Sequence, residues 1–140
     1  MNLKKLLLLP VTLMFSATGC AGIGGNSNYN MGTTSFLYDP SYKSYMVKIN
    51  GHEIGGGYGK AINTSPIKLG PQIVTWGESN SNKVHQAKNQ VILTKEDLKG
   101  VKYLAVHLYP DDTIEITTSN NWPTPTKKGD EWYDMLDKNK

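Results

Sequence analysis

The chain is poorest in cysteine and arginine. Its 140 residues include one cysteine, so no disulfide within the chain supports the fold. All 15 basic residues are lysines, and the chain therefore lacks the planar guanidinium groups that bind phosphates and base edges in two places at once. The formal net charge of +3 is also small for a nucleic-acid-binding surface. These shortages exclude a disulfide scaffold and disfavour nucleic acid as a partner.

Long hydrophobic runs are also scarce, apart from one near the N-terminus. Residues 6–17 form an apolar segment after Lys4 and Lys5, and this segment is shorter than the ~20 residues that a membrane-spanning helix needs. The small residues Ala17-Thr18-Gly19 at its end suit cleavage by a signal peptidase. Residues 1–19 are therefore predicted to be a signal peptide that is removed from the mature protein.

The single cysteine, Cys20, directly follows those small residues. This junction resembles the lipobox of bacterial lipoproteins, in which the cysteine sulfur receives a diacylglycerol and the new amino group is acylated. An ordinary secreted protein would instead begin with a lone thiol in an oxidising compartment, which invites stray pairing. The resemblance implies lipidation of Cys20 with fatty acyl chains such as palmitate. Ala21 in place of aspartate implies the outer membrane, with the protein facing the periplasm.

Composition divides the mature chain into a tether and one domain. Residues 20–34 combine the lipidated cysteine with a run rich in Gly, Asn, Ser and Thr, and they are predicted to form a flexible tether. Residues 35–140 are enough for one domain with a modest core. The expected order is signal peptide, tether and a single periplasm-facing domain.

Alternating apolar residues predict that this domain is mostly β. The strands are expected at residues 45–49, 72–76, 91–93, 101–109 and 114–117. Asn50-Gly51 predicts a two-residue hairpin in which Lys48 pairs with Glu53 and Val47 with Ile54. No helix is long enough for a parallel crossover. We therefore expect a single antiparallel domain that resembles a β-sandwich.

One or two short helices complete the expected fold. Thr94 followed by Asp97 predicts a capped helical turn that ends before Gly100. A second short helix is expected to begin near Asp130 and to pack Trp132, Met135 and Leu136 onto the sheet.

The densest glycine run spans residues 55–59, and its spacing matches no phosphate-binding motif. We interpret it as a mobile loop with Tyr58 at its crest, which would suit a partner-binding tip. Tyr103, His107 and Tyr109 alternate along one face of the strand at residues 101–109. They are core residues if a second layer covers them, which we favour, and otherwise an aromatic patch for a protein or sugar.

The sequence contains no recognisable catalytic or metal-binding constellation. His52, His85 and His107 are scattered, and neither H-E-x-x-H nor G-x-S-x-G occurs. Asp111-Asp112 follows a proline between two strands, which favours solvated turn residues over a carboxylate pair. We predict that the protein is not an enzyme and that it uses no cofactor or metal.

A set of short motifs lies between Met46 and Pro123. They are Ile49-Asn50-Gly51, Gly55-Gly56-Gly57, Leu69-Gly70-Pro71, Val74-Thr75-Trp76, Val106-His107-Leu108-Tyr109-Pro110-Asp111-Asp112 and Trp122-Pro123. Together these motifs resemble a family of bacterial lipoproteins with one uncharacterised β-rich domain. The cysteine pair and the Trp-Arg step that this family often carries are absent here.

Members of that family are often encoded beside phospholipase effectors of the type VI secretion system, and several act as their immunity proteins. The resemblance implies that this chain binds an incoming lipase tightly and covers its substrate entrance. We expect exposed loops to make the contact, with Tyr58, Lys60, Glu78 and Lys83 as candidates. The alternative is an envelope structural or ligand-binding lipoprotein with no toxin partner.

The lipid anchor can be tested directly. We expect cells fed with labelled palmitate to incorporate it into this protein, and the Cys20→Ser variant to remain unlabelled. Cell fractionation should recover the wild-type protein with membranes and the variant in the soluble fraction. A wild-type protein that is unlabelled and soluble would contradict the prediction.

Overall fold

The computed structural model describes residues 29–138. The signal peptide, Cys20 and residues 21–28 of the predicted tether lie outside this range. The described chain forms, in order, β1 (Tyr29–Leu37), β2 (Ser44–Ile49), β3 (His52–Glu53), β4 (Asn63–Ile67), β5 (Gly70–Gln72), β6 (Val74–Glu78), β7 (Val84–Gln86), β8 (Val91–Leu93), α1 (Lys95–Leu98), β9 (Tyr103–Leu108), β10 (Ile114–Ser119) and α2 (Lys127–Lys138).

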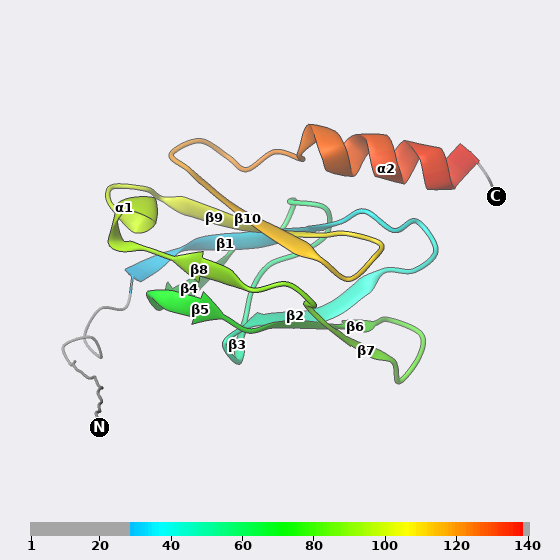
Figure 1. The fold of residues 1–140 in the computed structure, drawn as a ribbon, viewed down its shortest axis with the longest axis horizontal. Helices are drawn as coiled ribbons and strands as arrows, with labels where there is room; N and C mark the ends of the chain where they lie inside the picture. The colour runs from blue at the N-terminus through cyan, green and yellow to red at the C-terminus, as the bar shows by residue number, and fades with distance from the viewer. Residues whose placement is uncertain (1–28, 139–140) are drawn as a thin grey trace, which may run out of the picture.

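The strands form three sheets, which confirms the mostly β, sandwich-like fold. One four-stranded sheet has the order β10-β9-β1-β4, the second has the order β3-β2-β6-β7, and β5 pairs with β8 alone. Figure 1 shows α2 on one side of the first sheet and the other two sheets on its opposite side. Every strand pair is antiparallel except β1 with β9, which is parallel.

Strand β1 corrects the predicted boundary between tether and domain. Residues 29–34 belong to this strand, which lies between β4 and β9 in the first sheet. The hydroxyl groups that suggested a linker are used within the domain: Thr33 Oγ1 donates to the carbonyl of Asn63 on β4 at 3.0 Å, and Thr34 Oγ1 donates to that of Ala61 at 2.8 Å. The prediction of a tether through residue 34 is therefore wrong for residues 29–34.

The Asn50-Gly51 hairpin is confirmed. Lys48 lies opposite Glu53, and the amide of Ile54 donates to the carbonyl of Val47 at 2.9 Å. Both turn residues have positive φ, at 50° and 83°, as a type I′ turn requires. The strand pairing was predictable because it depends on residues adjacent in sequence.

The strand predicted over residues 72–76 is interrupted at Ile73. Residues up to Gln72 pair with β8, whereas residues from Val74 pair with β2 and β7. Asn50 contacts the chain where it passes from one sheet to the other. Its side-chain oxygen accepts from the backbone amide of Ile73 at 2.8 Å, and its backbone amide donates to the Ile73 carbonyl at 2.7 Å. This contact joins residues far apart in sequence.

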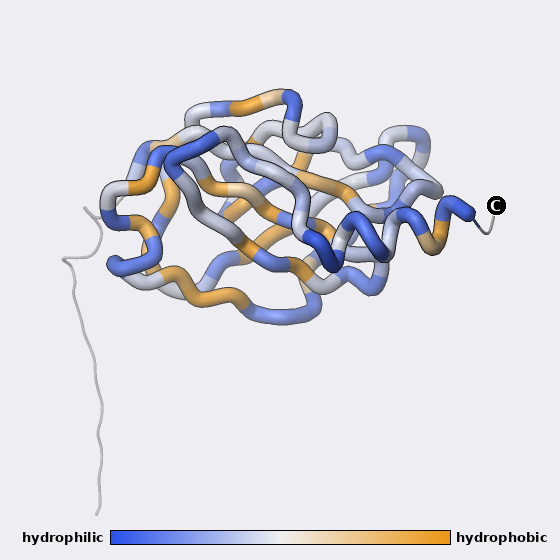
Figure 2. The backbone as a smooth tube through the Cα atoms, turned by 90° about the horizontal axis from the view of Figure 1, so that it is seen from above, coloured by the Kyte–Doolittle hydropathy of each residue, from blue (hydrophilic) through white to orange (hydrophobic). Residues whose placement is uncertain are grey.

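Two buried clusters lie on opposite faces of the first sheet. The larger lies between the sheets and includes Trp76, Ile49 and Leu104. The smaller lies under α2 and consists of Phe36, Tyr38, Ala105 and Tyr109, with Trp132 and Tyr133 packed against it. In Figure 2 hydrophobic segments follow the strands through the interior, whereas α2 is mostly hydrophilic. The helix therefore binds the sheet through aromatic rings and polar contacts.

Both predicted helices are present, with one boundary corrected. Thr94 and Asp97 form a reciprocal capping box on α1, as expected. Helix α2 begins at Lys127, before the predicted start near Asp130, because the hydroxyl of Thr126 accepts from the amide of Gly129 at 3.0 Å. Met135 is 54% exposed and does not pack as predicted.

Gly129 allows α2 to approach the first sheet closely. A Cβ atom at this position would lie 2.4–2.5 Å from ring atoms of Tyr38. Alanine normally stabilises a helix relative to glycine by ~1 kcal/mol, but such a close contact with an aromatic ring in a buried cluster costs more. The absence of a side chain at this position therefore fixes how far α2 lies from the strands.

We expect Gly129→Ala to lower the free energy of unfolding by about 1 kcal/mol or more. Urea unfolding should show a lower midpoint at an unchanged slope. Gly77→Ala is the matched control, because its Cβ would meet neighbours only at 3.4–3.8 Å, the range of ordinary packing. A stabilised Gly129→Ala protein would contradict the proposed close approach.

Candidate functional site

The aromatic face of β9 is buried, so the interpretation as core residues is confirmed. Ala105, His107 and Tyr109 are at most 1% exposed beneath α2. Tyr103 is half-buried, and its ring lies 6.0 Å from that of Trp122. The chain itself therefore covers His107 and Tyr109, while Tyr103 stays partly exposed beside Trp122, which is 56% exposed.

His107 takes part in a buried hydrogen-bond network. Its Nδ1 lies 2.8 Å from the hydroxyl of Tyr38, and its Nε2 lies 2.8 Å from that of Thr117. The amide of Thr126 donates to the Tyr38 hydroxyl at 3.0 Å, so the Tyr38 proton is free to point at Nδ1. Neutral His107 then carries its proton on Nε2. Burial lowers the pKa of His107 from 6.5 to about 4 and raises the pKa of Tyr38 to about 12.

The glycine-rich loop at residues 55–59 packs along β1, so the prediction that it forms a mobile tip is wrong. The amides of Gly55 and Gly59 donate to carbonyls of β1 at 3.2 and 3.0 Å. The Tyr58 hydroxyl donates to Asp130 on α2, and its ring packs edge-on against Phe36. Burial raises the pKa of Tyr58. Tyr58 therefore bonds to the helix although it is 39% exposed, and Lys60 is exposed nearby in the chain.

The structure places Glu78 beside Lys83, and this pair is separate from Tyr58 and Lys60. The Lys83 ammonium lies 3.9 Å from Glu78 Oε2 at the end of the β6–β7 hairpin. The same carboxylate oxygen lies 2.8 Å from Nε2 of His85, whose Nδ1 lies 2.8 Å from Asp112. Asp112 was predicted to be a solvated turn residue, but its carboxylate instead bonds to His85 of the hairpin.

The His85 ring also stacks on two aromatic residues. Its plane is 2° from that of Tyr42 and 4° from that of Trp76, at centroid separations of 5.1 and 5.3 Å. Trp76 Nε1 donates to the Tyr42 hydroxyl at 2.8 Å, and burial raises the pKa of Tyr42 to about 12. These contacts fix the hairpin rigidly to the turn before β10.

The histidines do not converge. His52 is exposed on the β2–β3 hairpin, whereas His85 and His107 are buried in separate networks. Across residues 29–138, no group of three or more His, Cys, Asp or Glu side chains is placed to hold a metal ion. Within the same range, no helix has both the length and the apolar character to cross a bilayer.

Exposed apolar side chains gather on the outer face of the second sheet. Tyr45 lies opposite Gly77 on β6, and Gly77 lies opposite Val84 on β7. Paired residues share a face, so these three form a row across β2, β6 and β7, which we name the Tyr45–Val84 strip. Tyr45 is 58% exposed and Val84 is 71% exposed. The buried Trp76 and His85 lie on the reverse face of the same strands.

A β-bulge explains why the sequence did not reveal the strip. Alternation from Val47 and Ile49 predicts that Tyr45 faces the core. The register instead shifts between Tyr45 and Lys48, and Met46 adopts a positive φ of 50° within the shift. The extra residue turns Tyr45 to the outer face. Met46 is also 41% exposed beside it.

Comparisons with protein-family models, with curated proteins and with solved structures gave no match to this chain. The family resemblance carried by the sequence therefore stays a prediction. Functional argument depends on the chain's own surface, where the Tyr45–Val84 strip is the clearest apolar feature. Two predicted contact residues, Glu78 and Lys83, are sequence neighbours of Gly77 and Val84, but the Glu78 carboxylate bonds to His85 on the reverse face of the sheet.

The His107 network predicts an acid-sensitive stability. The pKa of His107 in the folded protein is about 4, below its ordinary value of 6.5. As the pH falls, the unfolded chain therefore binds a proton at this residue before the folded protein does. The free energy of unfolding should therefore be unaffected by this group above pH ~7 and fall by up to about 3 kcal/mol between pH ~6.5 and ~4.

Urea unfolding across this pH range measures the effect. His107→Gln should flatten the pH dependence, whereas His52→Gln, at an exposed position, should leave it unchanged. An NMR titration that places His107 near its ordinary pKa would contradict this account.

Proposed function

We propose that this chain is a lipid-anchored protein without a reaction of its own, which binds a protein partner at the Tyr45–Val84 strip. The partner proposed is a phospholipase effector of the type VI secretion system, which the chain would neutralise in the periplasm as an immunity protein. The observation that supports binding at this face is a row of exposed apolar side chains on rigid strands.

The strip has the composition of an interface centre. Tyrosine is enriched in protein interfaces, and the exposed Tyr45 and Val84 lie on one face with Gly77 between them. The exposed Met46, another residue type enriched in interfaces, lies beside Tyr45.

Rigidity beneath the strip would favour tight binding. The His85 contacts join β6, β7 and the turn before β10, so little conformational entropy would be lost when a partner docks. An acylated Cys20 would confine inhibitor and lipase to one membrane surface, which raises their effective concentration. Inhibition would be stoichiometric, with the bound protein covering the substrate entrance of the lipase.

Val84→Glu tests this function because it places a charge at one end of the strip, on the most exposed of its residues. We expect the affinity for the purified lipase encoded beside this gene to fall about 30-fold, the effect of losing a typical hot-spot residue. Inhibition of phospholipid hydrolysis should weaken in parallel. Both can be measured by titrating the lipoprotein against the enzyme on vesicles.

Ile92→Glu is the matched control, since Ile92 is 59% exposed on β8 in the separate two-stranded sheet. We expect this variant to bind and inhibit like the wild type. Equal binding by the Val84 variant would contradict docking at the strip. Cells that lose the gene yet resist sibling attack would contradict the immunity function and leave an envelope structural or ligand-binding role.

A further inference from the structure

A hollow lies where β1 begins, at the opposite end of the molecule from the β6–β7 hairpin (Figure 1). Its volume is about 660 Å³, and β1, α1 and the segment after α1 form its walls. Met31 and Leu98, which are 5% and 1% exposed, contribute apolar surface to its lining. Tyr29, Lys95 and Lys99 add polar groups. The hollow is therefore amphipathic.

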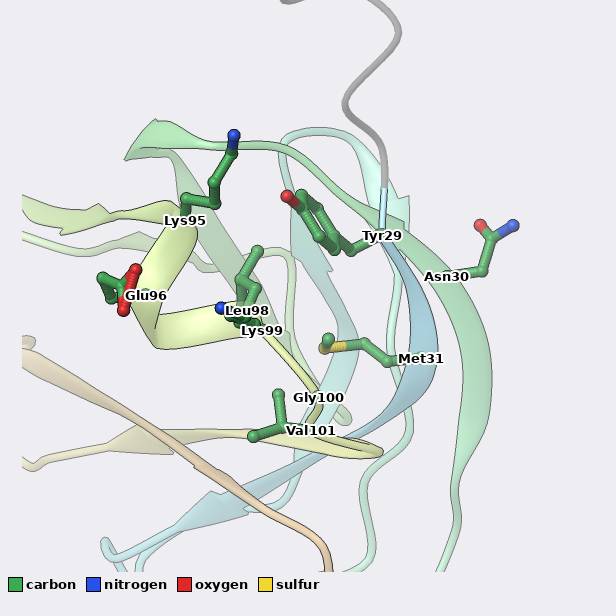
Figure 3. Close-up of a pocket in the computed structure, with 9 residues that line it drawn as sticks. All are labelled: Tyr29, Asn30, Met31, Lys95, Glu96, Leu98, Lys99, Gly100 and Val101. Carbon is green, nitrogen blue, oxygen red and sulfur yellow. The ribbon is translucent and has the colours of Figure 1, made fainter.

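The polar groups of the lining differ in direction. Figure 3 shows the Tyr29 hydroxyl and the Lys95 ammonium pointing to the same side of the hollow, while Glu96 and Asn30 point away from it. The carboxylate of Asp97 is bound to the backbone and hydroxyl of Thr94. The mouth of the hollow therefore presents cationic and hydroxyl groups.

Four exposed lysines belong to this end of the molecule. Lys95 and Lys99 flank α1, Lys68 follows the β4 residue that pairs with Tyr29, and Lys102 precedes the β9 residue that pairs with Gly32. Within residues 29–138, no ion pair involves these four ammonium groups. Glu96 and Asp97 are the acidic residues of α1, so positive charge prevails here.

The proposed lipid anchor is attached at this same end. Cys20 precedes Tyr29 by nine residues, which reach at most ~30 Å when extended. A flexible chain of this length spans only about 17 Å on average. An acylated Cys20 would therefore keep the hollow and its lysines close to the bilayer surface, where anionic phospholipids attract lysine.

We propose that this lysine-bearing end docks on the membrane, with the hollow taking the headgroup of an anionic phospholipid such as phosphatidylglycerol. Lys95 and Lys99 contact the phosphate, Lys68 and Lys102 contact neighbouring headgroups, and Tyr29 lies at the interface. The inference depends on the lipid anchor of the proposed function and is independent of the lipase partner.

Lysine labelling of the acylated protein tests the docking. The mature protein is reconstituted without any lipase, either in vesicles of phosphatidylethanolamine with phosphatidylglycerol or in vesicles of phosphatidylcholine alone. A soluble amine-acetylating reagent is added, and labelling rates are read by peptide mass spectrometry. The lysines Lys43, Lys60, Lys88 and Lys127 are internal controls, because they are exposed on other parts of the surface.

We expect Lys68, Lys95, Lys99 and Lys102 to react about fivefold more slowly on the anionic vesicles, the factor typical of one lysine at such a surface. The difference should disappear at about 1 M salt, and the control lysines should react equally on both vesicles. Equal rates at all lysines would overturn the proposal. So would equal protection by glycerol phosphate on phosphatidylcholine vesicles, which would indicate a small-anion site.

Acylation is read separately from the mass of the N-terminal peptide. A missing lipid would overturn the anchor and this proposal together, whereas an acylated protein with unprotected lysines would overturn the docking alone. In the non-acylated Cys20→Ser chain, replacing Lys68, Lys95, Lys99 and Lys102 with glutamine should lower binding to anionic vesicles at low salt at least tenfold. Replacing the four control lysines with glutamine should change binding much less.

Discussion

The fold depends on the fit between the hydroxyl-rich strand β1 and the glycine loop that lies along it. Carbonyls of Thr33 and Ser35 accept from glycine amides of the loop, and side-chain hydroxyls of β1 donate back to loop carbonyls. A Cβ on Gly59 would lie 2.3 Å from the Phe36 ring, so a larger residue would separate loop and strand. This contact aligns Phe36 and Tyr38 under α2.

The sequence predicted those elements whose signals are local. The hairpin at Asn50-Gly51 and the capping box of Thr94 with Asp97 are fixed by neighbouring residues, and both are confirmed. Strand β1 was taken for a tether up to residue 34, because its small and polar residues are buried by partners 20 to 70 positions away. The parallel pairing of β1 with β9 has no local signature either.

The candidate site was predictable only in part. Lys83 is exposed as expected of a polar loop, whereas Glu78 belongs to β6 and its carboxylate is only 19% exposed because it bonds to His85. Tyr58 was misread since glycine-rich composition suggests mobility, whereas here glycine permits close packing against Phe36. Tyr45 was assigned to the core by alternation, and only a bulge, which depends on pairing with β6, turns it outward.

The two proposed surfaces lie at different ends of the long axis, with the hollow beside α1 and the hairpin that borders the Tyr45–Val84 strip at the other end (Figure 1). A domain anchored through residue 20 and seated on its lysine-bearing end would point this hairpin away from the bilayer. A lipase approaching from the periplasm would then meet the strip before it reached phospholipid.

The central position of β1 has a mechanical consequence. With the proposed lipid on Cys20, a pull from the membrane would reach the fold through this strand, which is hydrogen-bonded to β4 on one edge and to β9 on the other. Such a force loads both ladders in shear, so many hydrogen bonds resist it at once instead of opening one after another. A tether attached to an edge strand at a corner of the sheet would load its hydrogen bonds one after another, so that strand would separate from the sheet at a lower force.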